Sequence, residues 1–428
     1  MSDMKFRCFS LGCKVNSYEC SALASSLISR DYQESKDKDL DVVIINTCSV
    51  TATADQKSRQ HIRKLMNEYP NAICVVMGCY SQGNYEYISR EIKPHILVGT
   101  SHRDEIPDLI EQYKKNKTPI VKVDDKPRFF KYEELGVTSY SENVRAYLKI
   151  QDGCDNFCSY CLIPYRRGKM RSRQKEYVID EAKYLISQGY KEIVLTGIHV
   201  GGYGRDLNDI SFSDLVEQLC DLEGLNSLRI SSIEESEIDE KLIRLYKEKK
   251  VLAKHLHIPL QSGSDKVLTL MNRKYTTEQF YNKINLIKQA LPDVAITTDV
   301  IVGFPQEDDE NFEETYNFIK RCGYHMLHVF PFSAREGTKA YTMSGQIDPR
   351  VKKERAARLL ELSKELWDKY TDRFVGKTVS VLIEKNDAQN IVSYGHTSNY
   401  IDVAIDSIDK KPGEIVEILL TKSMIVSK

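Results

Sequence analysis

Three cysteines lie close together near the middle of the chain. Cys154, Cys158 and Cys161 follow a C-x3-C-x2-C spacing within the segment Gly153-Cys154-Asp155-Asn156-Phe157-Cys158-Ser159-Tyr160-Cys161. A four-iron, four-sulfur cluster normally takes one thiolate on each iron. Three thiolates therefore predict a [4Fe–4S] cluster with one open iron, at which chemistry would take place.

Two other uses of these cysteines need to be weighed. A structural zinc site requires a second C-x2-C or a histidine pair, whereas Cys220 and Cys322 stand alone. A disulfide framework is disfavoured because the 11 cysteines are odd in number and the N-terminus has no signal-peptide pattern. The spacing favours the cluster and leaves zinc as the alternative.

A second set of cysteines is dispersed through the first part of the chain. Cys13, Cys48 and Cys79 each follow directly on a β-like run. The carboxyl ends of parallel strands line one crevice, so these thiols are expected to converge. The alternative is a buried apolar role, which we assign to Cys8, Cys20, Cys74, Cys220 and Cys322.

The elements that position these cysteines are predicted from hydrophobic patterning. Strands at 41–46, 72–77 and 96–99 alternate with helical segments and indicate an open parallel α/β sheet. A polar linker around Lys126-Pro127-Arg128 follows. Six further strands then indicate a barrel or partial barrel, predicted at 146–150, 193–196, 228–233, 256–260, 296–302 and 326–331. A helix at 349–370 and strands at 377–384, 398–405 and 414–420 predict a small terminal β-barrel.

Charge and hydropathy restrict the partners. The 61 lysines and arginines balance 62 acidic residues, so any nucleic-acid site must be a local patch. A basic run after the cysteine loop is the predicted RNA contact, with a solvated surface as the alternative; it comprises Arg166, Arg167, Lys169, Arg171 and Arg173.

The chain has no apolar run of ~18 residues, which predicts a cytoplasmic protein without a membrane partner. His199, His255 and His257 are interpreted as hydrogen-bonded core residues.

Several motifs in order along the chain resemble one enzyme family, the radical S-adenosylmethionine (SAM) methylthiotransferases. They are the cysteine loop, Asn46-Thr47-Cys48-Ser49-Val50-Thr51, Gly78-Cys79-Tyr80-Ser81-Gln82 and Pro259-Leu260-Gln261-Ser262-Gly263-Ser264. Leu11-Gly12-Cys13-Lys14-Val15-Asn16 and His328-Val329-Phe330-Pro331 resemble the branch that acts on N6-threonylcarbamoyladenosine next to the tRNA anticodon.

The resemblance implies three domains. Residues 1–118 would form the open parallel α/β domain that carries an auxiliary cluster. Residues 140–372 would form a radical-SAM partial (β/α)6 barrel. Residues 373–428 would form the small RNA-binding β-barrel called TRAM, in which Lys385 and Tyr400 are candidate RNA contacts.

The resemblance also implies the cofactors and the reaction. Cys154, Cys158 and Cys161 would hold a [4Fe–4S] cluster that binds SAM, and Cys13, Cys48 and Cys79 a second [4Fe–4S] cluster that supplies sulfur. Two SAM molecules would be used per turnover, one as radical source and one as methyl donor. The implied SAM contacts are Tyr160, Thr196, Gly197, Glu234 and Gly303. A monomer served by an electron donor such as flavodoxin or ferredoxin is expected.

Two other interpretations stay open at this point. The same chemistry could act on isopentenyladenosine in tRNA or on a ribosomal protein, because the branch assignment depends mainly on Lys14 and Val15. A zinc-stabilised RNA-binding adaptor is the alternative from a different class.

Overall fold

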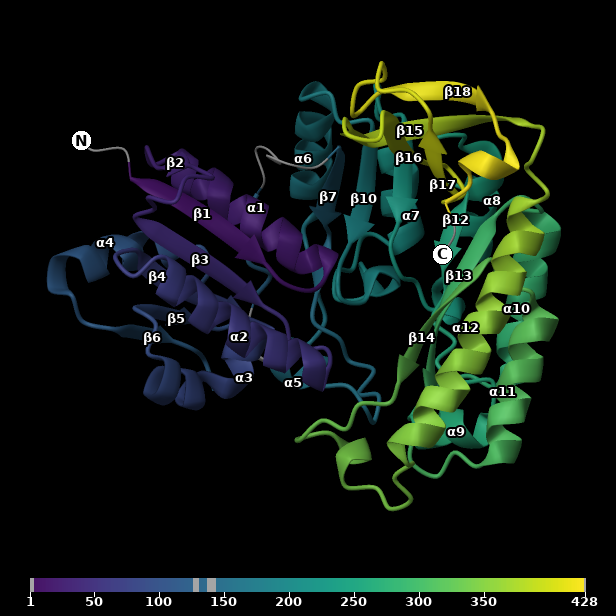
Figure 1. Ribbon diagram of the computed structural model, residues 1–428, viewed down its shortest axis with the longest axis horizontal. Coiled ribbons are helices and arrows are strands. Elements are labelled where there is room, and N and C mark those ends of the chain that lie inside the picture. The colour runs from purple at the N-terminus through teal and green to yellow at the C-terminus, as the bar shows by residue number, and fades with distance from the viewer. Residues whose placement is uncertain (1–3, 126–130, 137–143, 427–428) are drawn as a thin grey trace.

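The computed structural model describes residues 4–125, 131–136 and 144–426. Part of the expected linker, including Lys126-Pro127-Arg128, and the start of the predicted central domain lie outside the described residues. In Figure 1 the purple N-terminal layer lies beside the teal and green central strands, and the yellow C-terminal sheet lies against the ends of those strands.

The N-terminal layer is an open, fully parallel six-stranded sheet. Its spatial order is β2 (Gln33–Glu34), β1 (Lys5–Ser10), β3 (Val42–Thr47), β4 (Ile73–Gly78), β5 (Ile96–Val98) and β6 (Ile120–Lys122). The helices are α1 (Lys14–Ile28), α2 (Ala52–Glu68), α3 (Cys79–Tyr87) and α4 (Ile106–Asn116), with the π-helical turn η1 (Ile88–Ile92). The expected parallel sheet is present, and the short strand β6 extends it beyond the predicted boundary at residue 118.

Helix α1 connects the first two layers. Leu23 and Leu27 pack into the core of the N-terminal sheet, whereas Tyr18 and Ala22 pack into the core of the central strands. A helix that is apolar on two sides is buried between two bodies. The cysteine that precedes α1 is therefore placed at the junction of the two layers.

The central part consists of two three-stranded parallel sheets that continue into one another. Their strands are β7 (Arg145–Lys149), β10 (Glu192–Thr196), β11 (Ser227–Ile230), β12 (His255–His257), β13 (Ala295–Val302) and β14 (Met326–Pro331). A parallel bridge between Ser232 and His257 joins the two sheets. The result is a curved wall of six parallel strands, with the N-terminal layer beside it (Figure 1).

Helices cover the outer face of this wall (Figure 1). They are α6 (Lys175–Ser187), α7 (Phe212–Cys220), α8 (Glu240–Glu248), α10 (Thr277–Ala290), α11 (Asp309–Cys322) and α12 (Pro349–Thr371). Short elements between them are α5 (Ile163–Arg167), α9 (Asp265–Leu270), η3 (Val200–Gly202), η4 (Glu235–Glu237), η5 (Lys339–Tyr341) and the ribbon of β8 (Gln151–Asp152) with β9 (Arg171–Ser172). Local sequence sets the ends: Asp308 caps α11 at its start, and Gly323 ends it with a left-handed φ of +59°.

The C-terminal part is a four-stranded antiparallel sheet with the order β17, β16, β15, β18. Its elements are β15 (Thr378–Asp387), β16 (Val392–Thr397), β17 (Asp402–Ile405), β18 (Ile415–Leu419) and the turn η6 (Lys422–Met424). The strand predicted at 398–405 is wrong in its first half, because residues 398–401 form a turn in which Tyr400 has a φ of +66°. Trp367 and Tyr370 of α12 belong to the same core as this sheet and fix it to the central part.

Candidate metal centres and cavity

The dispersed cysteines meet at one cavity. Cys13, Cys48 and Cys79 follow β1, β3 and β4, and all three line a cavity of about 790 Å³. Cys13 interacts electrostatically with both of the other thiols. The sheet therefore brings together three sulfurs that are separated by more than thirty residues at each step.

The strand-end loops are held together by close backbone contacts. Gly12 has a φ of +99°, and a Cβ at this position would lie 2.5 Å from the Cys48 sulfur. The Asn16 side-chain amide donates to the carbonyl oxygens of Leu11 at 2.6 Å and Thr47 at 3.1 Å. The loops after β1 and β3 are thus fixed against each other, and no side chain larger than hydrogen fits at Gly12.

A buried arginine contacts the third thiol. The Arg167 Nε donates to the Cys79 sulfur at 3.1 Å, while its Nη1 lies 2.8 Å from Glu19 and 3.1 Å from Asp152. Burial raises the pKa of the Cys79 thiol to about 11, although Arg167 opposes the rise. Metal binding at Cys79 would therefore release a proton, and the adjacent guanidinium suits the thiolate that remains.

The basic run after the cysteine loop is mostly internal, which corrects the expectation of an RNA-contacting patch. Arg167, Arg171 and Arg173 are buried. Arg171 lies 3.3 Å from Asp152, and Arg173 lies 2.8 Å from Glu181. Their positive charges balance buried carboxylates, which is a structural role. Half-buried Arg166 and exposed Lys169 are the members of the run that stay partly open to solvent.

The second thiol set lies on a single loop after β8. Cys154, Cys158 and Cys161 are all half-buried. Gly153 enters the loop with a φ of +73°, and a Cβ there would clash with the Lys169 carbonyl oxygen. This contact fixes the start of the loop against the chain that returns from it.

Hydrogen-bond donors surround these sulfurs. The backbone N–H of Asn156 donates to Cys154 at 3.5 Å, and that of Ile163, the first residue of α5, donates to Cys161 at 3.4 Å. The Arg273 guanidinium donates to Cys158 at 3.5 Å. Hydrogen bonds to the sulfurs are one means by which proteins stabilise and tune iron–sulfur clusters. Three partly open thiols with such donors fit a cluster that has one open iron.

A pocket of about 130 Å³ lies beside this loop and includes Cys158, His199, Glu234 and Arg273 in its lining. Glu234 forms an ion pair with Arg273. Arg273 could not be predicted as part of this site, because an isolated arginine far from the loop in sequence carries no signal of its contact with Cys158. Of the loop cysteines, Cys158 lines this pocket, whereas the three dispersed cysteines line the larger cavity.

His199 was interpreted as a core histidine, and the structure places it next to a thiol. Its Nδ1 lies 3.9 Å from the Cys154 sulfur, and its Nε2 lies 2.6 Å from the Glu237 carboxylate. Burial opposes protonation, but the contacts with Cys154 and Glu237 outweigh it and raise the pKa of His199 to about 10. The cysteine loop therefore has a cationic neighbour.

The predicted SAM contacts are distributed over several places. Thr196 and Gly197 line the large cavity at the end of β10. Tyr160 is half-buried, with its ring edge-on to Phe304 at 6.4 Å. Gly303 has a φ of +71° and packs against a lysine side chain of α12, so its backbone conformation alone accounts for the glycine.

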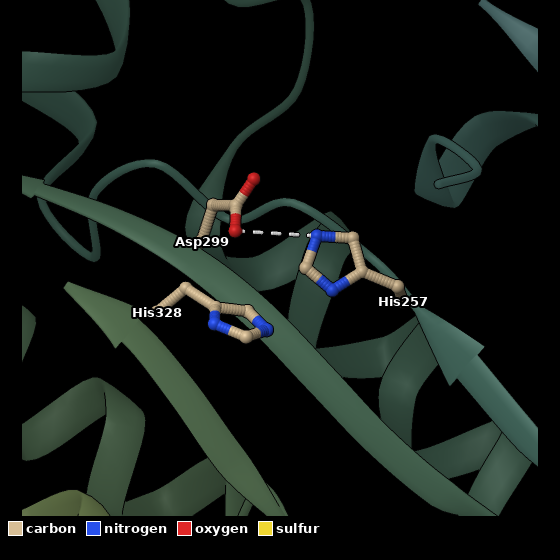
Figure 2. Close-up of side chains that lie close together, drawn as sticks. All are labelled: His257, Asp299 and His328. Carbon is tan, nitrogen blue, oxygen red and sulfur yellow. Dashed lines mark ion pairs between the residues drawn. The ribbon is translucent and has the colours of Figure 1, made fainter. Parts of the chain in front are cut away.

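A polar group lies on the central strands of the cavity wall (Figure 2). His257, Asp299 and His328 come from β12, β13 and β14, and one potential ligand atom from each lies within 4.8 Å of the others. The His257 Nε2 lies 3.3 Å from Asp299, and its Nδ1 lies 2.9 Å from the Thr297 hydroxyl. Both ring nitrogens of His257 therefore already have protein partners.

Tyr400 connects the cavity to the C-terminal sheet. It lines the cavity, stacks on His255 with ring centroids 4.9 Å apart, and accepts a hydrogen bond from Arg145 at 3.2 Å. Its ring also lies 4.5 Å from the Arg229 guanidinium. Tyr400 is thus directed into the cavity, whereas Lys385 is exposed on β15.

The chain is similar to known proteins of the radical SAM class. Residues 148–319 match the model of the radical SAM superfamily, and residues 5–99 match the uncharacterized protein family UPF0004. The radical SAM methyltransferase TsrM from Kitasatospora setae, solved with cobalamin and a [4Fe–4S] cluster bound, shares the fold with a TM-score of 0.62 at 13% identity, over 80% of this chain and 77% of that one. The central part is therefore a radical SAM fold, whose family implies a [4Fe–4S] cluster and SAM.

Two relatives narrow the class. The threonylcarbamoyladenosine tRNA methylthiotransferase MtaB of Bacillus subtilis (strain 168) is 43% identical over 96% of this chain and 93% of its own length. The tRNA-2-methylthio-N(6)-dimethylallyladenosine synthase of Acetivibrio thermocellus is 35% identical over 87% of this chain and 79% of its own length. The chain belongs to the radical SAM methylthiotransferase family.

In the described residues, no helix is both long and apolar enough to cross a membrane.

Proposed function

We propose that the chain converts N6-threonylcarbamoyladenosine, next to the anticodon of tRNA, to its 2-methylthio derivative. The observation that carries this proposal is the 43% identity, over nearly the whole of both chains, to the Bacillus subtilis enzyme named for that reaction. Identity to the dimethylallyladenosine synthases is lower, at 33–35%. An enzyme with this substrate would work in the cytoplasm, where tRNA is found.

The geometry suits a reaction that needs two metal centres. Cys154, Cys158 and Cys161 would hold the [4Fe–4S] cluster that binds SAM, and Cys13, Cys48 and Cys79 would hold a second one. When bound, these groups and SAM supply the radical that removes the C2 hydrogen of adenine and the methylthio group that replaces it. The assignment is supported by two separate thiol sets, each with cationic or N–H donors at sulfur.

The protein's own residues would orient and shield the reactants. Arg167 donates a hydrogen bond to the Cys79 sulfur. Arg273 donates to the Cys158 sulfur and also forms an ion pair with Glu234. Residues from all three parts of the chain line the large cavity, so an adenine bound in it would be partly shielded from bulk water. Tyr160, Thr196, Gly197, Glu234 and Gly303 stay the predicted SAM contacts.

The remaining partners follow from the same proposal. The C-terminal antiparallel sheet would be a TRAM domain that binds the anticodon arm through exposed residues such as Lys385. Half-buried Arg166 and exposed Lys169 would add to the RNA contact. A monomer that receives electrons from flavodoxin or ferredoxin and uses two SAM molecules per turnover completes the proposal.

Nucleoside mass spectrometry tests the function. Bulk tRNA from a strain that lacks the gene should lose 2-methylthio-N6-threonylcarbamoyladenosine and accumulate the unthiolated nucleoside, and the wild-type gene should reverse both changes. A Cys154→Ala gene should not reverse them. Loss of the isopentenyl derivative instead would contradict the substrate, and tRNA without any change would favour a ribosomal-protein substrate or the adaptor.

A further inference from the structure

We infer that Lys14 is the residue that selects the substrate, by binding the carboxylate of the threonylcarbamoyl group. This inference rests on the proposed function. The threonylcarbamoyl group carries the carboxylate of threonine, whereas an isopentenyl group is uncharged, so a cation in the cavity would separate the two substrates.

Charges that line the cavity have partners, with one exception. Arg229 lies 2.9 Å from Glu192, and Arg167 lies 2.8 Å from Glu19. Asp299 lies 3.3 Å from His257 on the strands shown in Figure 2. Within the described residues, Lys14 has neither a hydrogen-bond acceptor nor a carboxylate within ion-pair distance.

The charged neighbours of Lys14 are already paired with one another. Glu192 is the nearby carboxylate, and it lies 2.9 Å from Arg229 rather than within ion-pair distance of Lys14. Burial would raise the pKa of Tyr400, but Arg145 and Lys14 lower it, which places Lys14 close to this ring as well. A partly buried cation without a counter-ion is costly, so an incoming carboxylate would be bound strongly here.

The position of Lys14 suits the chemistry. It is the first residue of α1 and follows Cys13 directly, so it lies on the cavity wall next to the dispersed thiols. C2 and N6 of adenine flank N1 on the same edge of the base. An adenine whose C2 is directed toward Cys13 would therefore hold its N6 substituent near the adjacent wall, within reach of a lysine side chain.

The neighbouring arginines are less suited to this role. Arg145 lies 2.9 Å from Glu384 and also contacts Tyr400, and Arg229 donates to Glu192 through two nitrogens. Their guanidinium groups are already fixed by carboxylates. They would instead hold Tyr400 as a wall against which the substituent packs.

Binding to a pair of anticodon stem-loops tests the inference. One carries N6-threonylcarbamoyladenosine and the other its threonine methyl ester, which lacks the negative charge and adds one methyl group. Dissociation constants would be measured anaerobically by fluorescence anisotropy, with both clusters reconstituted. Wild type should prefer the acid by about tenfold or more, as expected for a hydrogen bond between charged groups.

Three variants test whether the preference for the acid stem-loop depends on Lys14. Lys14→Met keeps the length and apolar stem of the side chain and should reduce the preference to near unity, by weakening binding of the acid alone. Lys14→Arg should keep most of the preference. Lys57→Met, at an exposed position of α2, is the matched control and should retain the wild-type ratio.

The possible outcomes separate the claims. Equal weakening of acid and ester by Lys14→Met would mean that the ammonium contacts an RNA phosphate or SAM, and would overturn the inference. A wild-type protein that does not distinguish the two stem-loops would overturn it without any variant, so a folding defect cannot obscure the result. A wild type that fails to methylthiolate the acid stem-loop would contradict the proposed function itself.

Discussion

The two cysteine sets of the molecule are built in opposite ways. Cys154, Cys158 and Cys161 lie on one loop, so their spacing along the chain already brings their sulfurs close. Cys13, Cys48 and Cys79 follow three different strands and meet because β1, β3 and β4 are parallel neighbours in one sheet. The first set is a local motif, whereas the second depends on the correct assembly of a domain.

Their supports differ in the same way. The loop set is held mainly by backbone N–H donors and one arginine. The dispersed set depends on a buried ion network in which Arg103, Lys149 and Arg167 contact Glu19 and Asp152 across two layers of the molecule. A change in domain packing should therefore disturb the dispersed thiols first.

The largest effect should come from removing single thiols. Cys158→Ala should abolish both 5′-deoxyadenosine formation from SAM and the methylthio product, because it removes one of three ligands from the open cluster. Cys79→Ala should abolish the methylthio product while 5′-deoxyadenosine still forms. Anaerobic turnover with quantitation of both products by mass spectrometry measures this difference. Formation of the methylthio product by Cys79→Ala would contradict the separate roles of the two cysteine sets.

A smaller effect is expected from the ion network. Arg167→Met leaves Glu19 and Asp152 without one of their buried cations, which should lower the free energy of unfolding by about 3–5 kcal/mol. Lys169→Met, at an exposed neighbouring position, should change it by less than about 0.5 kcal/mol. Urea unfolding of both apo-proteins measures the two values, and equal stabilities would show that the network does not hold the layers together.

The smallest effect concerns the loop before Cys13. Gly12→Ala places a Cβ near the Cys48 sulfur in addition to adopting a φ of +99°, so it should cost about 2–3 kcal/mol and reduce iron at the dispersed set. Gly189→Ala shares a positive φ of +89° but meets no atom within 4 Å, and should cost only about 1 kcal/mol. Unfolding and iron assays check both variants, and full iron retention in Gly12→Ala would contradict the tight packing of these loops.

The predictable part of the fold is the part coded by local patterns. Apolar runs gave β3, β4, β10 and β13 within one or two residues of their observed bounds. The short strand β6 was missed because three residues carry too little pattern. The apolar pattern at 398–405 predicts a strand where Tyr400 forms a turn, because a left-handed residue other than glycine has no sequence signal.

The site shows the same limit. The loop cysteines could be recognised from spacing, but Arg167 was expected at the surface, because a run of positive charges does not reveal the carboxylates that bury it. Glu19 and Asp152 come from distant segments and only the tertiary structure brings them to Arg167. The contacts of Arg273 with Cys158 and of His199 with Cys154 could not be predicted for the same reason.

The most direct test of two separate metal centres is the iron content of three reconstituted proteins. Wild type should bind about eight iron atoms per chain, as two [4Fe–4S] clusters require. Replacing Cys154, Cys158 and Cys161 by alanine, or Cys13, Cys48 and Cys79 by alanine, should each leave about four. A wild type with about four irons, or zinc in place of iron, would contradict the account.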